Sequence, residues 1–385
     1  MFRRLPLGFA GVVAAAIAIA ACSSPNATQA IAVGPNFPSQ TLYAANVTQN
    51  AVSIYSPGPK STTGPLYEIG GSNTTIAGPQ YLAFDSQSDL WVTNWLSSTG
   101  DGGILEFKAL ATGNVLPFQS FSLGTVRPRG IVDYLYTFSG QTTAVDILAV
   151  AITDPSQPTA FNSGLEFYVA SLLSTPFQTL AGPATGLNVP SGLAVDSKNN
   201  IYAANLQGAS VTEYTLPSAS PTSSPTPTPT ASPTPAPTPT GATASPSPTP
   251  VPTPTPVNIA PVATISGAAS GINQPTSVAI DSNNYIYVSD QSSSICSPKP
   301  NCPAILIFKP GANGAVAPAQ YIAGSNTRLV APTDVKVDKA GNIYVADEAA
   351  GAGVIYVFAS TANGNVAPMA TLNSPGAVIG LGLAP

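Results

Sequence analysis

The sequence predicts an all-β protein, and two observations support this fold class. A pattern of two short apolar runs around a polar turn recurs along the chain, and no long amphipathic helical segment interrupts it. Each copy starts with Pro, continues through a run of the type Leu-Ala-Val to an Asp, and ends in a run of the type Ile-Tyr-Val-Ala followed by Asp or Asn. The clear copies span residues 79–94, 190–205, 275–290 and 332–347.

Each copy predicts a β-hairpin. The apolar runs are short and rich in β-branched and aromatic residues, and Pro, Asp, Asn, Ser and Gly bound them, which is typical of strands. The Asp carboxylate that opens the turn can accept backbone N–H groups two residues on, and the Asn or Gly within the turn tolerates a positive φ. Because apolar residues occupy adjacent positions, we expect both faces of these strands to be buried.

The hairpins belong to larger units. Third strands such as residues 305–308 and 354–358 follow them, and we expect outer strands to begin at Asn114, Asn258, Ala315 and Asn365. Four strands that repeat every 40–50 residues or so are typical of a β-propeller. Units start at Pro79, Pro190, Pro275 and Pro332, and a degenerate one at Pro128.

The two ends of the propeller region supply one more unit. Residues 42–46 look like a second strand that lacks a first, and residues 375–383 look like a first strand that lacks a second. The sequence therefore predicts a six-bladed β-propeller over residues 41–385, whose ring is closed by pairing of its N- and C-terminal strands. Such closure leaves only short, protected sheet edges.

Residues 217–256 are rich in Pro and Thr and carry no charge. The distance from Pro190 to Pro275 is 85 residues, and subtracting this segment of 40 leaves 45, an ordinary unit length for this chain. We therefore expect a disordered insertion between two paired strands of blade four rather than a linker between domains. A steric bristle, an envelope spacer, a site of O-glycosylation and a neutral expansion all remain open.

Residues 1–22 have the features of a targeting segment. Arg3 and Arg4 precede an apolar run, and Ile19-Ala20-Ala21-Cys22 resembles the lipobox of bacterial lipoproteins. This resemblance implies lipidation of Cys22, with residues 23–40 as a flexible tether. An ordinary signal peptide, or a membrane helix that contains a Cys, is the alternative, although the run is short for a span.

Composition and cysteines point to the same compartment. Only 8% of the residues are charged, about a third of the usual share. Without Arg3 and Arg4, 10 basic and 17 acidic residues give a net charge of −7, which offers no nucleic-acid footprint. In an oxidising compartment Cys296 and Cys302 are expected to pair as a disulfide, and a metal site is the alternative. The predicted location is extracytoplasmic, in the outer membrane, the periplasm or at the cell surface of a bacterium.

The recurring text resembles the NHL repeat, clearly in four blades and weakly in the other two. As a guide to function this resemblance is broad, because propellers host unrelated activities. It implies a relation to binding propellers and to gluconolactonase-like hydrolases, which hold a metal with a Glu–Asn–Asp set. Ligands of such propellers usually sit over the central channel, on the face where first strands begin and second strands end.

That placement selects the candidate binding residues at the channel mouth: Asn46, Tyr81, Asn94, Trp95, Arg129, Asn205, Asp290, Asp334 and Asp347. Asn205, Asp290 and Asp347 are also weak candidates for a divalent cation such as Ca²⁺. The alternative is structural: the recurring Asp or Asn satisfies backbone N–H groups of the neighbouring loop. Arg129 is expected to bind an anionic ligand or to pair with Asp334.

No catalytic group stands out. The chain contains no His, its five Glu residues fall in outer strands or loops, and no Gly-x-Ser-x-Gly elbow is present. The sequence thus predicts a non-enzymatic, lipid-anchored, monomeric module that binds a protein or saccharide without a required cofactor. A metal-dependent, gluconolactonase-like hydrolase and a structural envelope spacer are the alternatives.

Overall fold

The computed structural model describes residues 40–56, 58, 64–95, 102–153, 163–173, 175–215, 256–296, 301–349 and 352–385. The targeting segment with Cys22, the predicted tether up to residue 39, and residues 217–255 of the insertion lie outside the described residues. No helix in the described part of the chain has the length and apolarity needed to cross a membrane.

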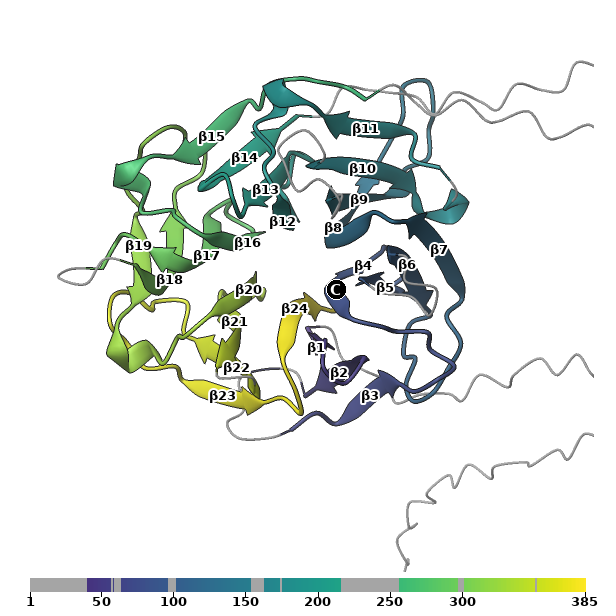
Figure 1. Cartoon of the computed structure of the whole chain (residues 1–385), viewed down its shortest axis with the longest axis horizontal. Coiled ribbons are helices and arrows are strands. Elements are labelled where there is room, and N and C mark those ends of the chain that lie inside the picture. Colours follow the sequence, from purple (N-terminus) through teal and green to yellow (C-terminus); the bar gives the residue numbers. More distant parts are fainter. Residues whose placement is uncertain are drawn as a thin grey trace, which may run out of the picture. The chain divides into compact units, whose positions relative to one another are not determined.

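The described strands form six four-stranded antiparallel sheets, which are the blades of a propeller arranged around a central axis (Figure 1). Blade 1 contains β24 (Val378–Leu383), β1 (Leu42–Asn46), β2 (Ala51–Tyr55) and β3 (Tyr67–Gly70). Blade 2 contains β4 (Pro79–Phe84), β5 (Leu90–Asn94), β6 (Gly102–Phe107) and β7 (Gln119–Gly124). Blade 3 contains β8 (Arg127–Tyr136), β9 (Val145–Thr153), β10 (Ser163–Val169) and β11 (Gln178–Ala181).

The other three blades follow in chain order. Blade 4 contains β12 (Pro190–Val195), β13 (Ile201–Asn205), β14 (Ser210–Tyr214) and β15 (Ala263–Ser266). Blade 5 contains β16 (Pro275–Ile280), β17 (Ile286–Ser293), β18 (Cys302–Phe308) and β19 (Gln320–Ala323). Blade 6 contains β20 (Pro332–Val337), β21 (Ile343–Ala349), β22 (Ala352–Phe358) and β23 (Ala370–Asn373). The predicted all-β, six-bladed fold is confirmed.

Ring closure occurs in blade 1, where β24 pairs with β1 in antiparallel register from Leu42 opposite Leu383 to Asn46 opposite Val378. The two strands come from opposite ends of the propeller region, as expected. In blade 4, β14 pairs directly with β15 although 48 residues separate Tyr214 from Ala263.

The hairpin turns follow the predicted chemistry. In blade 4, the Oδ1 atom of Asp196 accepts the backbone N–H groups of Lys198 and Asn200 at 2.8 and 2.9 Å. Asn199, between them, has a φ of 63°. Equivalent bonds to Asp85, Asp281 and Asp338 close the turns of blades 2, 5 and 6. These carboxylates therefore replace the backbone partners that a tight turn lacks.

Burial explains why the strand residues are apolar on both faces. All five residues of β1, β5 and β13 are buried, because neighbouring sheets pack face to face on either side. One such layer, between blades 3 and 4, joins Phe167 and Leu180 to Leu193 and Tyr214. Buried side chains of this size each contribute about 1.5–3 kcal/mol to folding.

The predicted starting points of the outer strands were wrong. These strands begin at Gln119, Ala263, Gln320 and Ala370, five residues after the expected starts in each case. The Asn-Val-x-Pro segments instead connect neighbouring blades. The Oδ1 atom of Asn365, for example, accepts the backbone N–H of Asn326 from blade 5 at 2.7 Å. Asn114 and Asn258 accept equivalent backbone N–H groups from blades 1 and 3, whereas the segment at Ala315 has no Asn. Sequence similarity alone does not distinguish these contacts from strand pairing.

Candidate functional site

The propeller has two faces, which strand direction defines. We call the side on which the first strand of each blade begins the start face, and the side on which it ends the end face. Second strands and fourth strands finish on the start face. The predicted channel-mouth residues therefore lie on the start face or in the half of the channel next to it. Figure 1 shows the six innermost strands, β4, β8, β12, β16, β20 and β24, surrounding the axis.

The Asn and Asp residues at the ends of second strands turn toward their own blade. Asp290 accepts the backbone N–H groups of Asn273 and Gln274 at 2.8 and 3.1 Å, and that of Ser292 at 2.9 Å. Asp347 accepts those of Val330 and Ala331. Burial raises the pKa of both carboxyl groups, and these backbone donors oppose the rise.

The asparagines at the same position behave alike. Asn94 accepts the backbone N–H of Ala77 at 2.6 Å, and Asn205 accepts that of Asn188 at 3.1 Å. Asn46 donates to the Ser374 hydroxyl at 3.2 Å. All five residues of this set are at most 2% exposed. Their hydrogen bonds match the structural alternative, and the candidates Asn205, Asp290 and Asp347 each use their oxygen atoms within a separate blade.

Tyr81 crosses the central axis. It belongs to β4 of blade 2, yet its hydroxyl lies 3.1 Å from the Ser191 Oγ of blade 4. The same hydroxyl lies 3.0 Å from the Thr276 carbonyl of blade 5 and 3.2 Å from the Thr333 carbonyl of blade 6. Burial, followed by the nearby charge of Asp334, raises the pKa of this phenol. Tyr81 therefore blocks the channel and ties one half of the ring to the other.

We expect Tyr81→Phe to lower the free energy of unfolding by about 1–3 kcal/mol, because buried acceptors then lose their donor. Urea denaturation of the purified propeller measures the change. Tyr321→Phe is the control, since Tyr321 is 37% exposed on the outer strand β19. Equal losses in the two variants would contradict a cross-axis role for the Tyr81 hydroxyl.

Asp334 is a buried junction between three blades. Its Oδ1 atom accepts the Ser277 hydroxyl of blade 5 at 2.5 Å, and its Oδ2 atom accepts the backbone N–H of Leu381 of blade 1 at 2.7 Å. Its ion-pair partner is Lys336, at 3.4 Å. The expected pair between Arg129 and Asp334 is wrong, because Lys336 lies on the same strand as Asp334 and neutralises it locally.

Arg129 instead lies beside an aromatic ring on the start face. The guanidinium carbons of Arg127 and Arg129 lie 5.0 and 5.4 Å from the centre of the Trp95 ring, which is cation–π distance. The backbone of Arg129 is fixed because its carbonyl accepts the Thr93 hydroxyl at 2.6 Å. Burial, together with the charge of Arg127, lowers the pKa of Arg129. We call Trp95, Arg127 and Arg129 the cationic mouth.

The cationic mouth has unused hydrogen-bond donors. The Trp95 Nε1 and the Arg129 Nε are buried atoms that have no hydrogen-bond partner among the residues that the structure describes. Within the described residues, neither arginine has a carboxylate within ion-pair distance. Donors that are buried and unpartnered cost free energy, so their presence in a folded protein calls for an acceptor. The sequence singled out Trp95 and Arg129 but missed Arg127, which precedes the degenerate repeat.

Cys296 and Cys302 also lie on the start face, Cys296 after β17 and Cys302 at the first position of β18. Their sulfur atoms are bonded as a disulfide, and their Cα atoms lie 6.1 Å apart. Pairing of these two cysteines is the arrangement expected from the sequence.

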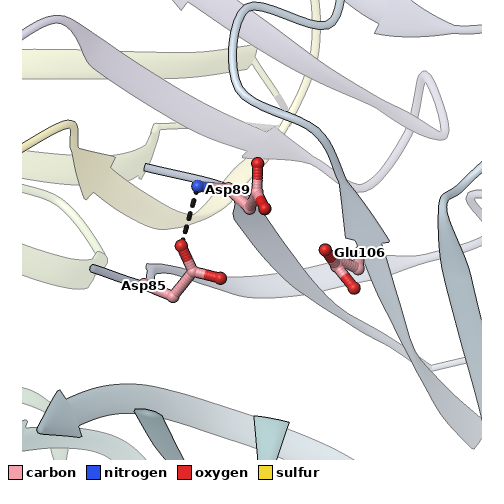
Figure 2. A group of neighbouring side chains, drawn as sticks. All are labelled: Asp85, Asp89 and Glu106. Atoms are coloured by element: carbon pink, nitrogen blue, oxygen red, sulfur yellow. Dashed lines mark hydrogen bonds between the residues drawn. The ribbon is translucent and has the colours of Figure 1, made fainter. Parts of the chain in front are cut away.

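A buried acidic group that sequence reasoning missed lies toward the end face (Figure 2). Asp85, Asp89 and Glu106 bring one oxygen atom each within 4.8 Å of one another. The ammonium of Lys108 lies 2.7 Å from Asp89 and 2.6 Å from Glu106. Burial lowers the pKa of Lys108, but its bonds to Asp89 and Glu106 outweigh this and raise it overall.

The remaining oxygens of this group also have partners. Asp85 accepts the Trp91 indole N–H at 3.1 Å, and the second oxygen of Glu106 accepts the side-chain amide of Gln119 at 2.6 Å. The backbone N–H of Ala109 donates to Asp89 at 2.7 Å. Lys108 thus supplies the positive charge that this acidic group requires. Glu106 lies next to the β4–β5 turn because β5 pairs with β6. The spacing of these residues in the sequence therefore did not predict the acidic group.

Comparison with known proteins supports the fold and no finer assignment. No protein-family model matches the chain, and no curated protein matches it. A crystal structure of a protein of unknown function from Bacteroides caccae aligns with a TM-score of 0.54 at 10% identity, over 90% of this chain and 98% of that one.

Two further solved structures are less similar. A protein from Lactobacillus plantarum aligns with a TM-score of 0.48 at 11% identity, over 89% of this chain and 99% of that one. A luciferin-regenerating enzyme aligns with a TM-score of 0.49 at 12% identity, over 88% and 94%. At 10% identity, the likeness to the Bacteroides caccae protein shows the fold alone.

Proposed function

We propose that this chain is an extracytoplasmic, lipid-anchored propeller of the NHL-repeat type that binds a ligand without catalysing a reaction. The lipobox-like sequence at Cys22 and the Cys296–Cys302 pair support the location. The cationic mouth supports the binding function and is the observation that carries it. Its ligand bears an anionic group, such as the carboxylate of an acidic saccharide or of a protein side chain.

Charge and geometry favour an anion at this place. Two guanidinium groups lie over one indole ring, and both the indole and Arg129 retain a buried donor. Charge-assisted hydrogen bonds from arginine to a carboxylate are among the stronger polar contacts in proteins. Because Tyr81 blocks the channel beneath, the ligand binds at the surface of the start face and does not thread through the ring.

The hydrolase alternative receives no comparable support. The Asn and Asp residues that would stand in for a metal-binding set already accept or donate hydrogen bonds within their own blades. Such a set also needs a Glu, and Glu106 lies toward the end face, where it bonds to Lys108.

Fluorescence tests the binding function, because the chain has only two tryptophans. In a Trp91→Phe background, Trp95 reports on the cationic mouth alone. We expect galacturonate to change its emission in a saturable way, and neutral galactose to leave it unchanged. Arg129→Ala should weaken galacturonate binding about 10- to 100-fold, since hydrogen bonds to charged groups contribute about 1.5–3 kcal/mol.

Arg328→Ala is the matched control, because Arg328 is an exposed arginine near the start of β20 on the same face. It should leave the affinity unchanged. Equal weakening by the two variants, or no saturable change with galacturonate, acetate, sulfate and phosphate, would overturn the proposed site.

A further inference from the structure

Exposed apolar side chains are unevenly distributed between the two faces. Ten large hydrophobic residues are exposed among those that the structure describes, and nine of them lie on the end-face side of the propeller. They include Leu66, Phe118, Val262 and Met369 at the outer rim. The tenth, Val330, precedes β20 on the start face. Scattered apolar exposure is normal on a protein surface, and we take its concentration on one face of the described residues as the starting point for an interaction surface.

The rim residues share one structural position. Each follows a proline and immediately precedes or opens the fourth strand of its blade, where its backbone N–H donates to the third strand. Phe118 donates to the Glu106 carbonyl at 2.7 Å and Met369 to the Val357 carbonyl at 2.8 Å. Their side chains remain 62% and 43% exposed, so they are not required by the core. We call Leu66, Phe118, Val262 and Met369 the apolar rim.

The chain enters the propeller on this same face. The backbone N–H of Gln40 donates to the Ala384 carbonyl at 2.8 Å, and its side-chain oxygen accepts the backbone N–H of Lys339 at 2.9 Å. Both partners lie at strand ends of the end face. Residues 23–39 separate Cys22 from this point, and 17 residues span at most about 60 Å. A lipid on Cys22 would therefore tether the propeller from its end face, within about 60 Å of the bilayer.

The charged residues of the end face suit a membrane interface. All five described lysines, Lys108, Lys198, Lys309, Lys336 and Lys339, lie on this side. Long lysine side chains can lay their methylene groups on apolar surface and keep the ammonium in water. The turn aspartates of the same face have their carboxylates bonded to backbone N–H groups. Charge on this face is mixed, so contact would depend on apolar insertion rather than on anionic lipids.

We propose that the end face lies against the lipid bilayer, with the apolar rim inserted at the level of the headgroups. The proposal rests on the lipid anchor of the proposed function. It places the start face, with its cationic mouth and disulfide loop, away from the membrane and toward soluble or surface-bound ligands.

Two valines provide a matched test, because Val262 on the end face is 56% exposed and Val330 on the start face is 57% exposed. Val262→Cys and Val330→Cys variants of the full, lipidated chain are labelled with an environment-sensitive fluorophore. They are then reconstituted on phosphatidylcholine vesicles with brominated acyl chains. We expect the label at 262 to be quenched at least about threefold more than the label at 330, because only the rim reaches the acyl boundary.

Flotation with the vesicles separates the two proposals. If the wild-type chain floats and Cys22→Ser does not, the anchor stands, and equal quenching at the two positions would then overturn end-face docking alone. If the wild-type chain fails to float, the anchor and the docking proposal are both wrong.

Discussion

Replacing Asp133 by Asn is expected to stabilise the propeller at alkaline pH and to leave its stability nearly unchanged at pH 4. Asp133 lies within β8 and lines a pocket of about 220 Å³ formed by the ends of the first strands around the axis. Its Oδ1 atom is buried and has no hydrogen-bond partner in the described part of the chain. Burial, and then the charges of Asp146 and Asp85, raise its pKa to about 8.

The direction of the effect follows from proton linkage. Because the pKa of Asp133 is higher in the folded protein than its usual value of 3.8, folding favours the protonated carboxyl. The protonated Asp133 carboxyl contributes fully to the stability of the folded protein below pH 4, and this contribution is lost as the pH rises through 8. We expect Asp133→Asn to add about 2–3 kcal/mol at pH 9, less than the full pKa shift implies, because solvent partly reaches this residue.

Guanidinium unfolding at pH 4 and pH 9 measures this difference. Asp196→Asn is the control, because the Asp196 carboxylate accepts two backbone N–H groups of its turn. An alkaline loss of stability that persists in Asp133→Asn would show that another group causes it.

Replacing Asp334 by Ala is expected to lower the free energy of unfolding by about 3–5 kcal/mol, the usual cost of breaking a buried ion pair. The substitution leaves the Leu381 N–H, the Ser277 hydroxyl and the Lys336 ammonium without their common acceptor. These groups belong to blades 1, 5 and 6, so the loss weakens two blade junctions at once.

Asp334→Asn separates charge from hydrogen bonding, since its amide oxygen can still accept the Leu381 N–H. Its loss should be about half that of the alanine variant, and urea denaturation measures both. A loss below about 1 kcal/mol for Asp334→Ala would mean that the blades rely on apolar packing alone at this junction.

The fold was predictable because local chemistry and the global repeat agree. The hairpin of residues 332–347 contains the residues that bound its strands, the Asp that closes its turn and the Asp that ends its second strand. Each of these residues makes its contacts within the same blade. Ring closure followed from two half-hairpins, at residues 42–46 and 375–383, that had no local partner.

The site was harder to predict because its contacts are long-range. The Tyr81 hydroxyl contacts three residues that lie 110, 195 and 252 positions further along the chain. No local sequence pattern predicts contacts over such separations. Asp133 lies where the other repeats have their turn Asp, but β8 continues to Tyr136, and the Asp133 carboxyl lies near Asp146 of β9 and Asp85 of blade 2. Periodic sequence text identifies what every blade shares, whereas the proposed binding function rests on Trp95, Arg127 and Arg129, which are not among the repeated residues.

Pairing of β24 with β1 also constrains when the protein can fold. Blade 1 takes its innermost strand from Val378–Leu383, so its sheet is incomplete until almost the whole chain is available. Contacts between residues more than 300 positions apart form slowly, because the loop they close is long. Blades 2 to 6 can each form from local hairpins, but the ring remains open at one seam during synthesis. We therefore expect this seam to close late in folding.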